Sequence, residues 1–499
     1  MVRTVAWLAF LTLAVATGGS TVGEQMPHPA QEALRRVVDL SIGELAKVTL
    51  SNQETIRVQL LEIAETADAL RGATIGAKVR VRIGDQEVWL PSGNYALPTT
   101  VETVQVDCPI TKGYLRNSDG NPWALVKDAR LRFWPAGSPW MEPGSYLYPA
   151  RQRWFASMTQ MADEPTYVDV SPTLSREGIY YHDQLDIGGA EGLVEIVAAT
   201  DGVVIVRGEQ ARDDIADFGY KPRYDRVAVL DARGWLHVYS HLKHIDENVV
   251  VGKRIRQGDR IGLLGKEGSS GGWSHLHYGI FARQPSGEWG TEEGYAYLME
   301  AYRRAHDPAV LAVARPHHLS APGERVTLDG SRSWSRDGTL AYQWTFSDGT
   351  TAEGVQVVRT YSKPGIYSET LRVSDGSGHV DYDFAVVQVY HAARGKMPPS
   401  IHAAYTPTLA IEPGDAVTLL VRVFNTTDGT AVWDFGDGSE SVTVRCNPVK
   451  PDGSDALAPD GYVPTVHRYA KPGHYLVRVE HTEGDVRATA RLHVRVGSD

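Results

Sequence analysis

A tandem repeat in the C-terminal part of the chain limits the possible folds more than any other feature. The first copy centres on Tyr342-Gln-Trp-Thr-Phe-Ser-Asp-Gly349 and the second on Val432-Trp-Asp-Phe-Gly-Asp-Gly438. A segment of the form Tyr-x-Lys-Pro-Gly-x-Tyr follows in each copy, at 361–367 and 469–475. A repeat of about 100 residues, with aromatic residues near Asp-Gly turns, is typical of β-sandwiches. The sequence therefore predicts two sandwich domains, at 308–392 and 398–497.

The rest of the chain is also expected to be rich in strands and divided into domains. A chain of 499 residues is too long to fold around one hydrophobic core, and an apolar fraction of 42% excludes wholesale disorder. Strand patterns at 56–60, 78–83 and 87–90 follow a short helical pattern between Ala33 and Leu40. We therefore expect a mainly β, multidomain protein.

Pro- and Gly-rich segments indicate where these domains begin and end. We expect an N-terminal β-rich domain of unknown role at 28–135 and a linker at 136–174. A domain of short strands and glycine turns follows at 175–305, with a helix near Tyr295–Arg304.

The N-terminus has the pattern of a secretory signal peptide. Arg3 precedes an apolar run from Val5 to Ala16, which ends in the small-x-small sequence Ala14-Val-Ala16. The run is shorter than the roughly 20 residues that span a bilayer. We assign 1–20 to a signal peptide and expect a secreted or periplasmic, cell-envelope protein with no transmembrane segment after cleavage.

Charge and cysteine content exclude two further classes. Lys and Arg number 50 against 61 Asp and Glu, with no long basic run, which gives no support for nucleic-acid binding. Only two cysteines are present, so the chain is not a disulfide scaffold. Cys108 and Cys446 fall in different domains, and we favour two unpaired thiols over a bridge that requires those domains to dock.

The segment 274–281 places two histidines together. Its apolar and aromatic residues favour a strand, on which His275 and His277 point to one face while Leu276 packs behind them. A second expected strand carries His237, Tyr239 and His241 on one face.

A third histidine and a carboxylate precede both strands. His182 and Asp186 are four residues apart, about 13 Å on a straight strand, so they meet only if the chain bends. Imidazoles and a carboxylate from separate segments form the ligand set that catalytic zinc prefers, with one position left open for water. The spacing of these residues alone is weak evidence for a metal site, and the order of the motifs strengthens that evidence.

That order resembles the motif set of the lysostaphin-like (LytM-type) zinc metalloendopeptidases. The matching motifs are His182-x-x-x-Asp186, Tyr239-x-His241-Leu242 and His275-Leu-His277, and the segments 198–204 and 251–265 resemble the family's strand and turn sequences. The resemblance implies that Zn²⁺ is held by His182, Asp186 and His277. It also implies that His241 and His275 are the catalytic pair, acting as general base and oxyanion stabiliser.

The same resemblance implies hydrolysis of peptide cross-links in bacterial peptidoglycan by a zinc-bound water. The sequence departs from the family at Gln184, in place of a glycine, and at the bulky Trp273. Two alternatives stay open: a protease acting on Gly-rich or other extracellular proteins, and a catalytically silent envelope-binding or hydrolase-activator module. A further expectation is autoinhibition, in which the segment Tyr146–Ser171 occupies the open zinc position.

The tandem repeat resembles polycystic-kidney-disease (PKD) domains, which are Ig-like β-sandwiches. The second copy matches closely, whereas the first departs at Thr345 and Ser347. The resemblance implies spacer modules with capped turns, and it leaves open glycan or matrix contact, or calcium binding at Asp329, Asp337 or Asp434.

Overall fold

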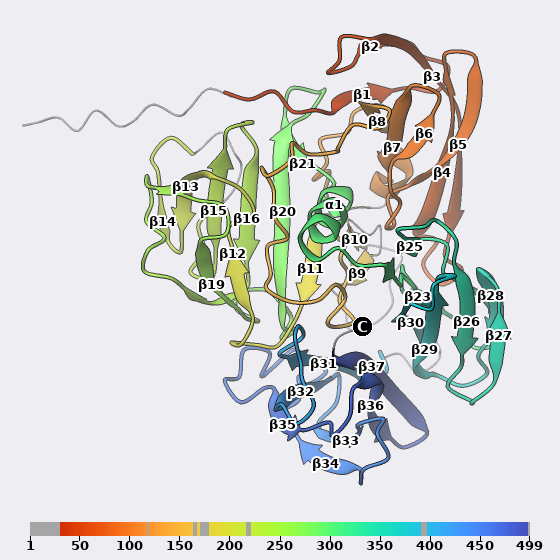
Figure 1. Ribbon diagram of the computed structural model, residues 1–499, viewed down its shortest axis with the longest axis vertical. Coiled ribbons are helices and arrows are strands. Elements are labelled where there is room, and N and C mark those ends of the chain that lie inside the picture. Colours follow the sequence, from red (N-terminus) through yellow and green to blue (C-terminus); the bar gives the residue numbers. More distant parts are fainter. Residues whose placement is uncertain are drawn as a thin grey trace, which may run out of the picture.

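The computed structural model describes residues 30–116, 118, 120–162, 167–169, 179–215, 221–390 and 397–497 of the 499. The expected signal peptide 1–20 lies outside these residues, as do 163–166 and 170–178 around the end of the expected linker. Within the described residues the protein has one α-helix among many strands, which confirms the mainly β, multidomain class (Figure 1). No helix in this part of the chain is both long and apolar enough to cross a membrane.

The N-terminal domain, 30–135, is built on a sheet with the strand order β1-β8-β7-β5-β4-β3-β2, to which β6 adds through β7. Its elements are β1 (Arg36–Leu40), β2 (Leu45–Thr49), β3 (Thr55–Ala67), β4 (Thr74–Ile83), β5 (Gln86–Ser92), β6 (Thr99–Val101), β7 (Val104–Thr111), the short 3-10 helix η1 (Lys112–Leu115) and β8 (Ala129–Pro135). The helical pattern expected between Ala33 and Leu40 is wrong, because β1 forms there and pairs antiparallel with β8. Adjacent β-branched Val37 and Val38 favour a strand, and pairing along the sheet edge outweighs the apolar spacing.

The central domain, 179–306, combines two sheets and the helix. The main sheet has the order β11-β20-β16-β15-β13-β14, with β18 on β13 and β21 on β20, and a small sheet has the order β12-β19-β17. Its elements, with β9 of the preceding segment, are β9 (Tyr167–Asp169), β10 (Ile179–Tyr181), β11 (Leu185–Gly188), β12 (Glu195–Val197), β13 (Gly202–Arg207), β14 (Gln210–Ala211), β15 (Val227–Asp231), β16 (Leu236–Ser240), β17 (Leu242–Ile245), β18 (Arg254–Ile255), β19 (Arg260–Leu264), β20 (His275–Arg283), β21 (Trp289–Thr291) and α1 (Tyr295–His306).

The first sandwich domain, 308–390, and the second sandwich domain, 397–497, share one continuous sheet. It has the order β23-β30-β29-β37-β36-β33-β34, and the domains join where β29 pairs parallel with β37. The strands are β22 (Val310–Leu311), β23 (His318–Ser320), β24 (Arg325–Asp329), β25 (Trp334–Ser335), β26 (Ala341–Thr345), β27 (Thr351–Glu353), β28 (Gln356–Thr360), β29 (Gly365–Ser374), β30 (Val380–Val389), β31 (Ser400–Thr406), β32 (Val417–Phe424), β33 (Thr430–Asp434), β34 (Val442–Arg445), β35 (Val463–His467), β36 (Gly473–Glu483) and β37 (Val486–Val496). The repeat tryptophans Trp344 and Trp433 are fully buried in the two cores, as the aromatic pattern predicted.

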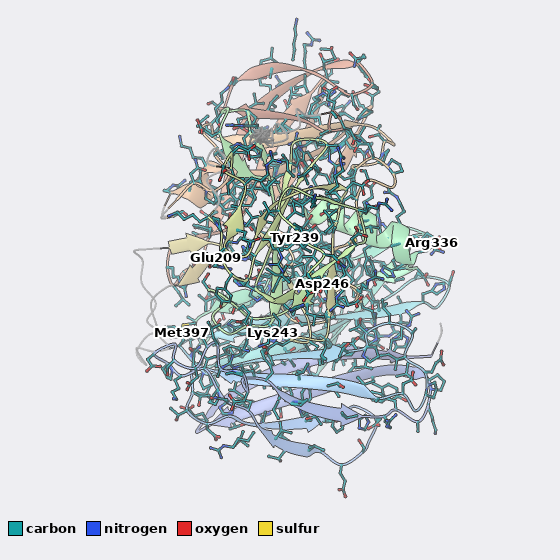
Figure 2. The ribbon with its side chains drawn as sticks, turned by 90° about the vertical axis from the view of Figure 1, so that its left-hand side faces the viewer. Glu209, Tyr239, Lys243, Asp246, Arg336 and Met397 are labelled. Carbon is teal, nitrogen blue, oxygen red and sulfur yellow. The ribbon has the colours of Figure 1, made fainter. Side chains whose placement is uncertain are left out.

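The helix α1 of the central domain lies near the centre of Figure 1 and contacts two of the other domains. Tyr295 of α1 packs edge-on against Tyr95 of the N-terminal domain, and Arg303 lies over the Trp334 ring of the first sandwich domain. One hydrophobic core cluster contains Trp134 of the N-terminal domain, most of the central-domain core, and Leu420 and Tyr462 of the second sandwich domain. Viewed from the side in Figure 2, the second sandwich domain lies directly beneath the central domain. The domains therefore share buried surface.

The two cysteines are free and buried in this arrangement, as favoured from the sequence. Cys108 belongs to the core of the N-terminal domain and Cys446 to that of the second sandwich domain.

Candidate functional site

The register of β20 with its two neighbours brings the sequence-predicted residues together. Asp186 on β11 lies opposite His277 on β20, and Gly188 lies opposite His275. On the other side of β20, Ser240 at the end of β16 lies opposite His277. The next residue, His241, is therefore carried to the same end of the sheet.

His241 does not continue the strand as expected. β16 ends at Ser240, and His241 has a left-handed backbone conformation with φ of 67°. The expected common face of His237 and His241 is therefore wrong, because the chain turns between them. His237 is fully buried and contacts Asp231 and the Tyr278 hydroxyl, at 3.0 and 2.8 Å from its two ring nitrogens. It is a core residue.

The first cluster of ligand-type side chains consists of His182, Asp186 and His277. One ligand atom from each lies within 4.8 Å of the others. Nε2 of His182 is 3.1 Å from Oδ2 of Asp186, and Nδ1 of His277 is 2.8 Å from Oδ1 of Asp186. The bend required between His182 and Asp186 is present, since β11 begins only at Leu185.

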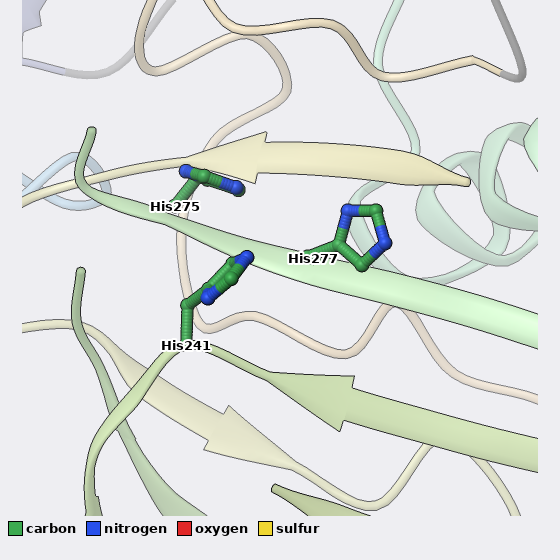
Figure 3. A group of neighbouring side chains, drawn as sticks. All are labelled: His241, His275 and His277. Carbon is green, nitrogen blue, oxygen red and sulfur yellow. The ribbon is translucent and has the colours of Figure 1, made fainter. Parts of the chain in front are cut away.

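The second cluster consists of His241, His275 and His277, and it shares His277 with the first. The ring centroids of His241 and His275 are 4.7 Å apart, and those of His241 and His277 are 5.6 Å apart. Figure 3 shows His275 and His277 on one strand, with His241 reaching towards that strand from the end of the neighbouring one. All five predicted residues thus lie together, and their roles stay a prediction.

The donor set of the first cluster fits a zinc ion. Zinc bonds of about 2.0–2.2 Å place tetrahedral ligand atoms roughly 3.4 Å apart, close to the separations between Asp186 and the two imidazoles. The side chains of Asp186 and His277 keep 16% and 17% of their surface exposed, so a ligand reaches the cluster from that side. Within the described residues, clusters of three or more such side chains occur only here, and Asp329, Asp337 and Asp434 belong to none.

Burial and mutual proximity shift the pKa values of the cluster. Burial raises the pKa of Asp186, but the neighbouring His182 and His275 outweigh this and hold it well below its usual range. Burial lowers the pKa of His275 to about 3, although Asp186 opposes the shift. His275 is therefore a neutral imidazole at neutral pH.

Backbone carbonyls orient the two rings that are not zinc ligands in this assignment. Nδ1 of His241 lies 2.6 Å from the carbonyl oxygen of Glu267, and Nδ1 of His275 lies 3.0 Å from that of Trp273. A carbonyl only accepts hydrogen bonds, so Nδ1 is the donor in each ring, and Nε2 of the neutral His275 ring is unprotonated.

Two residues near His241 were not singled out by the sequence. Asp225 accepts a hydrogen bond of 2.8 Å from the His241 backbone amide, and it pairs with Arg223. Arg223 also donates to Ser269 and lies 3.3 Å from Nδ1 of His241. The sequence Arg-Tyr-Asp at 223–225 matches no specific motif that would have indicated these residues.

The departures from the family pattern have clear positions. Gln184 is buried and lies over Gly279, where a Cβ would meet its amide oxygen at 2.2 Å. This glycine gives the larger side chain room. Trp273 points away from the cluster and contacts the second sandwich domain.

The segment expected to be inhibitory runs along the edge of the central domain. Gln160 accepts a hydrogen bond from the Asp186 amide through its carbonyl, and Gln152 donates to the Gly188 carbonyl. No residue of the described part, 146–162 and 167–169, belongs to either ligand cluster. Residues 163–166 and 170–171 lie outside the described residues, so the expectation of autoinhibition stays a prediction.

Comparison with known proteins agrees with the motif order. Residues 180–287 match the family model of peptidase family M23, and residues 306–389 and 402–496 each match a PKD domain model. The chain thus contains a metallopeptidase domain of family M23 followed by two PKD domains. Domains of both kinds are typical of extracellular proteins.

Solved structures give weaker matches. Helicobacter pylori Csd3 is 15% identical, over 49% of this chain and 82% of that one, with a TM-score of 0.21. The fibronectin(III)-like modules of Clostridium thermocellum CbhA are 11% identical, over 38% of this chain and 93% of theirs, with a TM-score of 0.15. Scores this low assign no common fold to the whole chain.

Proposed function

We propose that the protein is an exported zinc metalloendopeptidase that hydrolyses peptide cross-links of bacterial peptidoglycan. The observation that carries the proposal is the pair of clusters joined at His277. One cluster offers a zinc ligand set, and the other places two further imidazoles beside it. The M23 match and the N-terminal signal-peptide pattern support the reaction class and the export.

His182, Asp186 and His277 would hold the zinc ion. When bound, zinc acts as a Lewis acid that polarises the peptide carbonyl and lowers the pKa of a coordinated water towards 7. The low pKa of Asp186 keeps its carboxylate charged, which suits a cation ligand.

His241 and His275 supply the proton transfers and the hydrogen bonds. Their carbonyl partners occupy Nδ1 of each ring, so Nε2 is the atom that accepts a proton, and Nε2 of His275 lies 3.3 Å from Oδ1 of Asp186. One ring takes the proton of the attacking water as general base and returns it to the leaving amine nitrogen. The other, once protonated or hydrogen-bonded through a water, stabilises the charge that develops on the carbonyl oxygen.

The PKD domains and the N-terminal domain would hold the enzyme at the envelope, with glycan or matrix contact through the sandwiches. The peptide of peptidoglycan is the proposed substrate because the family resemblance favours it.

The test uses the purified full chain on isolated sacculi, with zinc measured by elemental analysis. We expect about one zinc per chain and release of uncrosslinked fragments, both lost in His277→Ala. The control is His244→Ala, since His244 is exposed on β17 and belongs to neither cluster. Cleavage of casein but not sacculi would make the protein a general extracellular protease, and zinc binding without any cleavage would make it a silent module.

A further inference from the structure

The loop that precedes His275 is held by the second sandwich domain. The loop comprises residues 268–274, and Gly268, Gly271 and Gly272 in it have left-handed φ values of 65°, 67° and 87°. A segment with this much glycine and no strand or helix has little intrinsic rigidity. Its conformation therefore depends on what it packs against.

The ring of Trp273 is the first point of contact. It stacks on Phe424, at the end of β32, with ring centroids 4.1 Å apart and planes 7° from parallel. The edge of His402 on β31 lies against the same indole, with centroids 5.4 Å apart. Aromatic contacts of this kind stabilise beyond the apolar area that they bury.

The backbone on both sides of Trp273 is held as well. The Ser274 amide donates a hydrogen bond of 2.9 Å to the Tyr462 hydroxyl, which itself lies 2.7 Å from Nδ1 of His402. Arg422 donates to the Gly272 carbonyl at 3.2 Å and is fully buried. Three consecutive loop residues are thus held in place: Gly272 through its carbonyl, Trp273 through its ring and Ser274 through its amide.

These contacts lead directly to the catalytic ring. The carbonyl that orients His275, at 3.0 Å from its Nδ1, belongs to Trp273, the residue whose ring lies on Phe424. The Ser274 hydroxyl donates to the Gly189 carbonyl at 2.8 Å, which ties the loop to the end of β11. A displacement of Trp273 therefore moves the acceptor that sets the tautomer and direction of His275.

We propose that the second sandwich domain is a structural part of the catalytic centre, in which Phe424 and Tyr462 are positioning residues for His275. The inference rests on the proposed peptidase function. A domain that served only as a tether would need no contact with the loop that carries a catalytic histidine. Trp273, which departs from the family pattern, here has a specific partner.

The test compares four variants of the full chain. Phe424→Ala removes the stacking surface, and Phe424→Tyr retains it. Tyr462→Phe removes the acceptor of the Ser274 amide. Tyr469→Phe is the matched control, because Tyr469 is a buried tyrosine of the same domain whose hydroxyl donates to the Phe435 carbonyl, away from the loop.

On a soluble cross-linked muropeptide we expect Phe424→Ala to lower kcat by about 10- to 100-fold with little change in KM or zinc content. Phe424→Tyr should restore most of kcat, and Tyr469→Phe should resemble the wild type. Tyr462→Phe should speed hydrogen exchange at the Ser274 amide and lower kcat in the same direction as Phe424→Ala.

The outcomes separate this inference from the proposed function. If the wild type cleaves and both Phe424→Ala and Tyr462→Phe keep its kcat, the positioning role is overturned. If the wild type cleaves nothing, the proposed function fails, and hydrogen exchange across 268–275 still decides whether the second sandwich domain holds the loop. Unchanged exchange in Phe424→Ala and Tyr462→Phe would then reject the inference.

Discussion

Asp186 lies directly opposite His277 in the antiparallel pair of β11 and β20, and the two side chains approach to 2.8 Å. Ninety residues of sequence separate the partners, yet the sheet register alone places a carboxylate and an imidazole side by side. The same register places His275 opposite Gly188, at the end of the strand pair. A cross-strand pair thus supplies two of the three proposed zinc ligands.

Asp186→Asn is expected to remove zinc binding while preserving the shape of the site. The amide is the same size but has no charge to balance the cation, and the ligand set is lost. Zinc affinity should fall by more than the roughly 10- to 100-fold seen when an outer partner of a ligand is changed. Competition with a chelator measures this affinity. The control is Asp183→Asn, whose carboxylate accepts from Thr291 and belongs to neither cluster; an equal loss there would contradict the assignment.

Tyr181→Phe tests whether the N-terminal domain supports the site. Tyr181 lies one residue before His182. Its hydroxyl accepts a hydrogen bond of 3.0 Å from the buried Thr74 amide of the N-terminal domain. Losing it leaves that amide unpaired, at a cost of about 1–3 kcal/mol in the free energy of unfolding. We also expect weaker zinc binding, measured by chelator competition.

Tyr114→Phe is the matched control for Tyr181→Phe. Tyr114 packs edge-on against Tyr181, but its buried hydroxyl has no hydrogen-bond partner in the described structure. Removing that hydroxyl should leave both stability and zinc affinity close to the wild type. Equal effects of the two substitutions would contradict a specific role for the Tyr181 hydrogen bond, because both variants keep their aromatic rings.

Arg132→Met is expected to weaken the docking of the N-terminal domain on the central domain. Arg132 is fully buried and contacts Asp107, Glu292 and Glu293 at 2.6, 2.9 and 3.0 Å. Its removal leaves buried carboxylates without their partner, which typically costs about 3–5 kcal/mol. Burial already raises the pKa of Glu293 to about 7 despite the guanidinium. Urea unfolding should show the loss, whereas Arg82→Met, which breaks an exposed pair with Glu87, should cost less than about 1 kcal/mol.

Local patterns in the sequence predicted individual strands better than they predicted turns or pairing with distant strands. The apolar and aromatic residues of 274–281 predicted the strand β20. The common side of His275 and His277 followed, because side-chain direction in a strand depends only on residue parity. The turn after Ser240 was missed, since a positive φ at a histidine has no signature in residue type. The short helix expected before Leu40 was wrong because its apolar residues pair with a strand about ninety residues away.

The sequence did not predict the contacts between domains. Trp273 was noted only as a bulky departure, and nothing in its neighbourhood pointed to Phe424 some 150 residues later. Buried Arg132 and Arg422 were not predicted either, because arginine is usually exposed and each of the two has a partner in another domain. The proposed ligand residues were identified from the order of the motifs, whereas the residues that hold them in place depend on tertiary packing.

Acidification is expected to destabilise the second sandwich domain and its contact with the loop 268–274. His402 is fully buried and contacts the Tyr462 hydroxyl, the Ser157 hydroxyl and the Trp273 ring, which are all uncharged. Burial lowers the pKa of His402 to about 3, against about 6.5 in an unfolded chain. Between these values the unfolded chain binds one more proton than the folded chain, so the free energy of unfolding falls as the pH falls.

We expect His402 to lower the free energy of unfolding by about 1.4 kcal/mol per pH unit as the pH falls below 6.5, and to leave it unchanged above that value. Urea unfolding between pH 7.5 and 4.5, monitored by near-UV circular dichroism, measures the slope. His402→Gln cannot be protonated and should make the slope shallower by about that amount, even if it lowers stability at pH 7.5. His244→Gln is the control, because His244 lies at an exposed position of β17, and this variant should leave the slope unchanged. A slope that His402→Gln does not alter would show that His402 is protonated in the folded protein.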